Sequence, residues 1–221
     1  MENKISILST RKLLSNQKQL LLNAGFKLEE VDFIQIQLLP FTVDSVNDFL
    51  IFTSQNAVKS VVQNERFSFL KSKKCFCVGI KTKRLLEQNG FEVVRYFEYA
   101  EELAAYLLLH FSNTSFTFFT GNLRRDTLPE AFEKGKIIYK EIEVYHTKLS
   151  PQKRNHQTNG ILFFSPSAIE SYLQNNNLVN EMCFCIGTTT AEPLVNKTTN
   201  IQIAVEPTVE SVIEAVIDYY K

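Results

Sequence analysis

An internal repeat limits the possible folds of this chain more than any other feature. The segment LIFTSQNAVKSVV at 50–62 aligns with ILFFSPSAIESYL at 161–173, at an offset of 111 residues. The run CFCVG at 75–79 reappears as CFCIG at 183–187, at an offset of 108. These offsets are about half of the 221 residues, so the chain consists of two copies of one structural unit.

Each copy shows strand-like and helix-like segments in alternation. This pattern predicts parallel sheets with helices on both faces. The expected strands are 5–9, 50–53, 75–78 and 92–95 in the first copy, and 116–120, 161–164, 183–186 and 201–205 in the second. A long alternating segment, 31–39 or 137–149, precedes Pro40 or Pro151, and we interpret the two segments as extended connections between two lobes.

The first helix of each copy is expected to follow the first strand. In the first copy, its apolar face is assigned to Leu13, Leu14, Leu20, Leu21 and Leu22. Gly25 and Gly135 are expected to end the two helices, because glycine readily adopts the left-handed conformation that closes a helix.

The composition is that of an ordinary globular protein, with 44% hydrophobic and 22% charged residues. The 24 basic and 24 acidic residues cancel, so no overall field attracts nucleic acid or an anionic membrane. No run reaches the roughly 18 apolar residues that span a bilayer, and the opening residues MENKI lack an apolar signal region. We therefore expect a cytoplasmic protein with neither nucleic-acid nor membrane partners.

The four cysteines form two Cys-x-Cys pairs, Cys75 with Cys77 and Cys183 with Cys185. One interpretation is a metal site built from both pairs. The favoured interpretation is small buried strand residues in a reducing compartment, because zinc sites usually use wider cysteine spacing on turns. We therefore expect no metal.

Polar turns follow the expected strands in both copies. Ligands of open parallel sheets bind beyond the carboxyl ends of the strands, and hydroxyl and backbone N–H groups at a helix N-terminus attract anions. The turns are STR at 9–11, TSQN at 53–56, GIKT at 79–82, TGN at 120–122, SPS at 165–167 and GTTT at 187–190. Arg11, Lys81, Arg124 and Arg125 would add positive charge nearby. Such residues are also ordinary helix N-caps, so capping and anion binding both remain open.

No other catalytic pattern emerges from the sequence. The three histidines have no spacing typical of a metal site or a triad, and the seven glycines form neither G-x-G-x-x-G nor a phosphate-binding loop. A nucleotide-dependent enzyme is therefore disfavoured. Tyr145 places an aromatic hydroxyl on one of the two extended connections, although a half-buried strand tyrosine would give the same pattern.

The ordered set of motifs resembles the uroporphyrinogen III synthase family over nearly the whole chain. The segment FTGNLRRDTLPEAFEKGKIIYKEIEVYHT at 119–147 resembles its central signature. The family's repeated turns are matched by LIFTSQNAV, LFFSPSAI, VGIKT and IGTTTAEPL, and its first short motif by STR. Gln55 departs from the family pattern, where proline is usual, and Lys81 stands where a small residue is common.

The resemblance implies two flavodoxin-like parallel-sheet α/β domains that are joined by a two-stranded hinge, with a cleft between them. Each domain would take residues from both repeats. The first would comprise 1–36 with 150–221, and the second 40–145, with 37–39 and 146–149 as the hinge segments.

The resemblance also implies the reaction. The substrate would be hydroxymethylbilane, a linear tetrapyrrole with eight carboxylates, which is dehydrated and cyclised with inversion of its last pyrrole ring and without a cofactor. Tyr145 is the candidate catalytic residue. The candidate substrate-binding residues are Arg11, Ser54, Asn56, Thr82, Gly121, Asn122, Ser165, Ser167, Thr189 and Thr190.

Two other functions remain open. A two-lobed protein could close on an anionic ligand without any chemistry, using the same turns, and a sensor module could share the fold. We expect a monomer with a small-molecule substrate and a transient contact with hydroxymethylbilane synthase.

Overall fold

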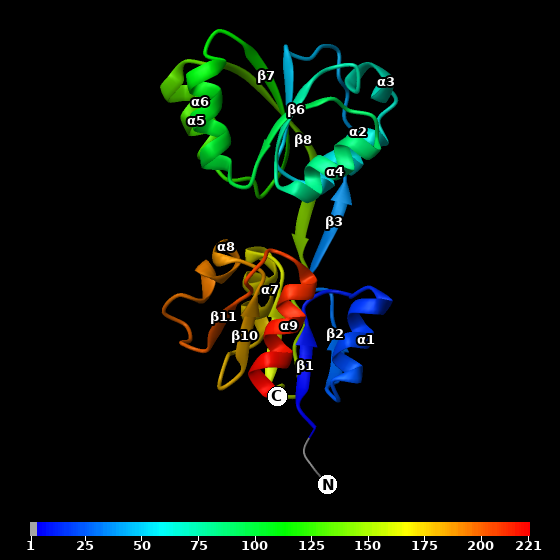
Figure 1. The fold of residues 1–221 in the computed structure, drawn as a ribbon, viewed down its shortest axis with the longest axis vertical. Helices are drawn as coiled ribbons and strands as arrows, with labels where there is room; N and C mark the ends of the chain where they lie inside the picture. The colour runs from blue at the N-terminus through cyan, green and yellow to red at the C-terminus, as the bar shows by residue number, and fades with distance from the viewer. Residues whose placement is uncertain (1–3) are drawn as a thin grey trace. The chain divides into compact units, whose positions relative to one another are not determined.

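The computed structural model describes residues 4–221 and divides into two compact units (Figure 1). Unit 1 consists of Met1–Gln35 and Lys148–Lys221, and unit 2 of Ile36–Thr147. Since the second repeat begins near residue 116, within unit 2, each unit combines chain from both repeats. No helix in the described part is long and apolar enough to cross a membrane.

Unit 1 contains a five-stranded parallel sheet. Its strands are β1 (Ser6–Ser9), β2 (Lys27–Glu30), β9 (Gly160–Phe163), β10 (Met182–Cys185) and β11 (Ile201–Ile203). Its helices are α1 (Ser15–Asn23), α7 (Pro166–Asn175), α8 (Thr188–Ala191) and α9 (Val209–Tyr220), with a 3-10 turn at Glu192–Leu194. The spatial order β11-β10-β9-β1-β2 is the flavodoxin-like order 2-1-3-4-5.

Unit 2 repeats this arrangement with its halves in the opposite chain order. Its strands are β4 (Phe49–Phe52), β5 (Cys75–Val78), β6 (Val93–Phe97), β7 (Ser115–Gly121) and β8 (Ile138–Leu149), and β3 (Ile34–Leu38) joins the edge of this sheet. Its helices are α2 (Gln55–Val62), α3 (Phe67–Leu70), α4 (Ile80–Gln88), α5 (Ala100–His110) and α6 (Thr127–Gly135). The order β8-β7-β4-β5-β6 becomes 2-1-3-4-5 when β7 is counted first. Each flavodoxin-like sheet therefore joins two strands of one repeat to three of the other.

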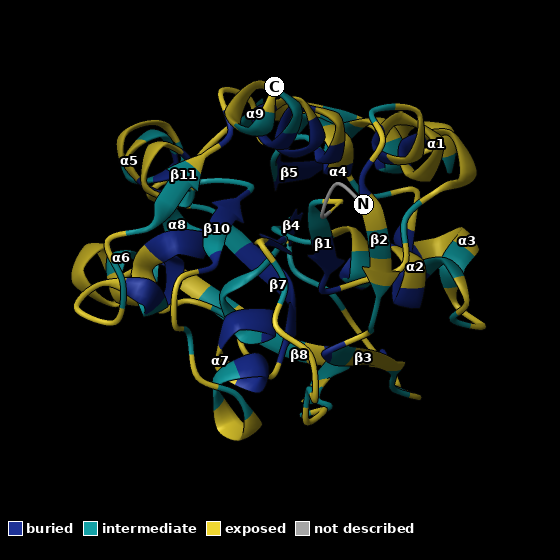
Figure 2. Ribbon diagram, turned by 90° about the horizontal axis from the view of Figure 1, so that it is seen from below, coloured by how far each residue is buried: buried dark blue, intermediate teal, exposed yellow. Residues whose placement is uncertain are grey.

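Both faces of each sheet are buried. In β4, Phe52 packs into the cluster of α2 and α4, whereas its neighbour Ile51 packs into the opposite cluster of α5 and α6. In β9, Leu162 packs towards α1 and α9, and Ile161 towards α7. The dark-blue colour of Figure 2 accordingly gathers on the strands and on the inward faces of the helices. Burial on two faces explains why these strands read as continuous apolar runs.

The chain passes between the units in β3 and again in β8. The Leu39 N–H donates to the Val144 oxygen at 2.9 Å, and the Ser150 N–H donates to the Phe33 oxygen at 2.9 Å. Because residue numbers rise along one strand as they fall along the other, β3 and β8 are antiparallel. The two alternating segments are thus strands, as predicted.

A helix follows β1 as predicted, but the apolar face assigned to it was wrong. Only Leu21 of the five assigned leucines is fully buried, and Leu14, Leu20 and Leu22 are more than 40% exposed. Successive helical residues point about 100° apart, so three consecutive leucines cannot share one face. The sequence also missed β2, whose residues KLEE lack apolar character because β2 is an edge strand.

The two helix-ending glycines have different roles. Gly25 has φ 86°, which is the left-handed conformation expected after α1. In α6, however, that conformation belongs to Lys136, at φ 53°. A Cβ on Gly135 would lie 2.1 Å from Leu108 Cδ2, so Gly135 allows α6 to approach α5 closely.

All four cysteines are fully buried in the core of their own units. Burial raises the pKa of Cys77, Cys183 and Cys185 to about 12, and also raises that of Cys75. These thiols are core residues of their strands, as the favoured interpretation holds. Within residues 4–221, no cluster of three or more His, Cys, Asp or Glu residues is placed to hold a metal ion.

Candidate active site

The residue that follows β1, Thr10, is hydrogen-bonded to β9. The N–H and hydroxyl of Thr10 both donate to the Leu162 oxygen, at 3.2 and 2.7 Å. The Ser9 hydroxyl donates to the Arg11 oxygen at 2.6 Å, which turns the chain away from the strand. The hydroxyls of this turn are therefore occupied, and the exposed Arg11 side chain is the group available to an anion.

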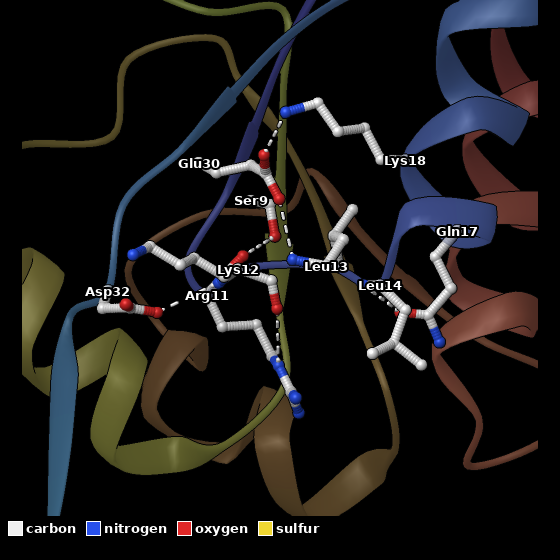
Figure 3. A network of polar contacts seen from close by, with 9 residues as sticks. All are labelled: Ser9, Arg11, Lys12, Leu13, Leu14, Gln17, Lys18, Glu30 and Asp32. Atoms are coloured by element: carbon white, nitrogen blue, oxygen red, sulfur yellow. Dashed lines mark hydrogen bonds and ion pairs between the residues drawn. The ribbon is translucent and has the colours of Figure 1, made fainter.

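Two carboxylates behind this turn fix the loop that follows (Figure 3). Glu30, at the end of β2, accepts hydrogen bonds from the Leu13 N–H and the Lys18 ammonium, both at 2.7 Å. Asp32 accepts the Lys12 N–H at 3.0 Å. Although burial alone would raise the pKa of Glu30, the bonds from Lys18 and Leu13 keep it below its ordinary value. Neither carboxylate was predicted from the sequence, because neither belongs to a recognisable motif.

Arg11 lies beside the turn that follows β9. Its guanidinium carbon is 5.7 Å from the centre of the Phe164 ring, and its Nε donates to the Lys12 oxygen at 3.3 Å. Phe164 directly precedes Ser165 in the chain. Unit 1 therefore brings two of the predicted substrate-binding segments together at adjacent strand ends.

Ser165 and Ser54 occupy equivalent positions of the repeat and act as N-caps. Ser165 Oγ accepts the Ala168 N–H at 3.2 Å and lies 3.1 Å from Ser167 Oγ. Ser54 Oγ accepts the Asn56 N–H at 3.1 Å. The side chains of Ser54, Asn56, Ser165 and Ser167 are half-buried. The Ser54 hydroxyl keeps its own hydrogen for donation to a ligand, whereas one hydroxyl of the Ser165–Ser167 pair donates to the other. The structure thus shows that both serines cap helices, and a capping serine can still bind a ligand.

Thr82 and Thr190 are less accessible than expected from the sequence. They are 5% and 4% exposed, and their N–H groups donate to the oxygens of Gly79 and Gly187 at 3.0 and 3.1 Å. Both threonines lie in the first turns of α4 and α8, and their side chains are buried there. Thr189, next to Thr190, is half-buried and presents more of its surface.

Tyr145, Gly121 and Asn122 lie together where β7 ends beside β8. Gly121 pairs with Tyr145, and the Asn122 N–H donates to the Tyr145 oxygen at 3.4 Å. The amide side chain of Asn122 is bonded to the backbone of Thr147. The half-buried Tyr145 ring packs against the cluster that contains Phe119 and Val144.

Arg124 does not provide the free positive charge that the sequence suggested. Its guanidinium is bonded to Glu141 and Asp126, and the bond to Glu141, followed by that to Asp126, raises the pKa of Arg124 further. A surface hollow of about 430 Å³ here is lined by Thr120, Gly121, Asn122, Arg124, Asp126, Glu141 and Glu143. With three carboxylates around one guanidinium, this hollow is unsuited to a polyanion.

These features define an α/β protein with two flavodoxin-like sheets, whose strand ends carry hydroxyl-capped turns and a tyrosine packed on a glycine. The family model of uroporphyrinogen-III synthase HemD (HEM4) matches residues 16–214. The chain therefore belongs to the uroporphyrinogen-III synthase family, whose members are lyase-type cyclases of haem biosynthesis. No curated protein matches the sequence significantly.

Solved structures of this family share the fold. The chain is similar to uroporphyrinogen-III synthetase from Helicobacter pylori, with a TM-score of 0.75, 20% identity and coverage of 97% of this chain and 99% of that one. It is also similar to a mutant uroporphyrinogen III synthase from Thermus thermophilus, with a TM-score of 0.68, 12% identity and coverage of 96% and 97%. The wild-type T. thermophilus enzyme gives a TM-score of 0.52 at 13% identity, with coverage of 97% of each chain.

Proposed function

We propose that this chain converts hydroxymethylbilane into uroporphyrinogen III, with loss of water and inversion of the last pyrrole ring. Membership of the synthase family carries this proposal. The Tyr145 ring, which packs against Gly121 where β7 ends beside β8, supports it as the candidate catalytic group.

Tyr145 is the proposed catalytic residue. The hydroxyl of the substrate leaves a carbon next to an electron-rich pyrrole, so its ionisation needs only modest assistance. A positioned acid contributes about 10²–10⁴-fold to such a step. The phenol of Tyr145 would donate a hydrogen bond or a proton to the departing hydroxyl.

The carboxylates of the substrate are proposed to bind at exposed strand ends of both domains. The proposed ligands are Arg11, Ser54, Asn56, Ser165, Ser167 and Thr189, whereas Gly121 would contribute by leaving room for the Tyr145 ring. The buried Thr82 and Thr190 would contribute through their turns rather than their hydroxyls. Because one helix end contributes only about 0.3–1 kcal/mol at exposed sites, binding would be distributed over many contacts.

Several organisational features belong to the same proposal. The domains would be 1–36 with 150–221 and 40–145, and segments 37–39 and 146–149 would act as a hinge. The protein would work as a cytoplasmic monomer, without nucleic-acid or membrane partners, and would receive its unstable substrate through transient contact with hydroxymethylbilane synthase.

Isomer analysis tests the reaction. Hydroxymethylbilane is generated in situ from porphobilinogen by its deaminase, the chain is added, and the oxidised products are separated into type I and type III uroporphyrin. A type III fraction that rises with protein concentration is the expected result. Type I product alone, from folded protein, would instead favour the anion-binding protein without catalysis.

A further inference from the structure

The side chain of Asn122 continues the β7–β8 ladder beyond the end of β7. The two strands pair in step until Thr120 meets Glu143, after which Gly121 pairs with Tyr145, so β8 carries one extra residue. Beyond this bulge, Asn122 Oδ1 accepts the Thr147 N–H at 2.8 Å, and Nδ2 donates to the Thr147 oxygen at 3.3 Å.

An amide side chain suits this position because it carries an acceptor and a donor side by side, as a neighbouring strand does. Only one orientation of the amide satisfies both bonds to Thr147, which fixes its assignment. Both polar atoms of Asn122 are therefore engaged by the backbone of its own unit. These two bonds give the exposed Asn122 side chain a structural role in the ladder.

The two hydrogen bonds between Asn122 and Thr147 lie where β8 leaves unit 2. Thr147 is the last residue of unit 2 before β8 passes into unit 1. On the other edge of β8, the Val144 oxygen accepts the Ser60 hydroxyl at 2.6 Å and the Leu39 N–H at 2.9 Å. Tyr145 thus lies between two points at which its strand is held, one on each edge.

We propose that Asn122 is a positioning residue that holds Tyr145 in its working orientation through the backbone of Thr147, and that it does not bind substrate. This inference rests on the proposed function, because it assigns Asn122 a task in the reaction of Tyr145. If Asn122 bound substrate, removing its side chain would raise KM. A lost positioning residue lowers kcat instead, because substrate still binds while Tyr145 is misplaced.

A double-mutant cycle tests this proposal. Asn122→Ala is expected to lower kcat for type III product by about tenfold or more, since displacements of the order of 1 Å cost up to about 10²-fold, while KM stays within about twofold. In the Tyr145→Phe background, the same substitution should change kcat by less than about twofold. The matched control is Asn113→Ala, at an exposed asparagine just before β7, which should leave both parameters unchanged.

Hydrogen exchange gives a readout that does not depend on activity. The Thr147 amide should exchange about tenfold faster or more in Asn122→Ala, because its partner is removed. If the alanine variant does not fold, Asn122→Asp goes through the same cycle, since it keeps an acceptor for Thr147 but loses the donor.

The possible failures can be told apart. A raised KM at constant kcat, an equal loss of kcat in both backgrounds, or unchanged Thr147 exchange overturns the positioning role. A Tyr145→Phe enzyme with the wild-type kcat refutes the role of Tyr145 and the positioning role with it. Exclusive type I product from the wild-type chain refutes the proposed reaction itself.

Discussion

The ring of Tyr145 lies directly against the α-carbon of Gly121. A Cβ on Gly121 would stand 2.4 Å from Tyr145 Cζ and 2.5 Å from Cε2, closer than any real contact. Gly121 is not among the glycines with positive φ, so the position requires a missing side chain and not an unusual backbone. The two residues are therefore one structural feature, although 24 positions separate them in the sequence.

Gly121→Ala should displace the Tyr145 ring and lower both stability and activity. Overpacking of this kind costs about 1–3 kcal/mol in the free energy of unfolding, measured by urea denaturation. The loss should shrink when Tyr145 is also replaced by serine, because the clash is then removed. An equal loss in both backgrounds would show that the ring is not the cause.

Tyr145→Phe should slow the reaction while the fold is kept. We expect kcat to fall by about tenfold to 10²-fold, since only the hydroxyl is removed from a general acid or hydrogen-bond donor. Steady-state kinetics of type III formation measures this. Tyr139→Phe, at a half-buried tyrosine on the same strand, is the matched control and should retain full activity.

The four cysteines should resist thiol reagents in the native protein. Their burial raises each thiol pKa far above neutrality, so the reactive thiolate is scarce at pH values near 7. A colorimetric thiol titration should detect all four only after unfolding in denaturant. Rapid reaction of any one under native conditions would contradict the described packing.

Glu30 should make the stability dependent on pH in the acid range. Because the pKa of Glu30 is lowered on folding, its contribution is present above its unfolded pKa and is lost as the pH falls through the folded pKa. Glu30→Gln should therefore cost about 0.2–1 kcal/mol near neutral pH, a small value because Lys18 is about half exposed and solvent screens the pair.

Urea denaturation across the acid range measures this difference. The wild-type protein and Glu30→Gln should converge as Glu30 becomes protonated. The exposed Glu65→Gln serves as the control and should show no such convergence. A difference that persists at the lowest pH would assign the effect to packing instead of charge.

The strands of this fold could be predicted because most of them are buried on both faces. Apolar runs such as those of β5 and β10 leave little choice of structure, and the repeat predicted them twice. The edge strand β2 could not be found in this way, because its residues KLEE satisfy an exposed edge and show no apolar pattern. The exchange of halves between the units came from the family resemblance, since local patterns do not specify which strands pair.

The candidate site was less predictable, because its geometry depends on residues that are distant in sequence. Gly121 and Asn122 were found through a motif, yet their contacts with Tyr145 and Thr147 arise only when β7 and β8 pair. The same applies to Glu30, which acts on a loop 17 residues earlier in the chain. Thr82 was expected to face a ligand, but the first turn of α4 buries it, and a sequence pattern does not distinguish these two outcomes.

The exchange of halves also sets an order of events during synthesis. Unit 2 is one continuous segment that ends at Thr147, so everything it needs has been made before β9 has left the ribosome. The segment containing β1 and β2 is made before unit 2, yet Ile7 must wait for Gly160 to supply its neighbour on the other edge of β1. Although β1 can pair with β2 at once, its other edge stays open until β9 has been made, and in the meantime the growing chain must keep this apolar strand from pairing elsewhere.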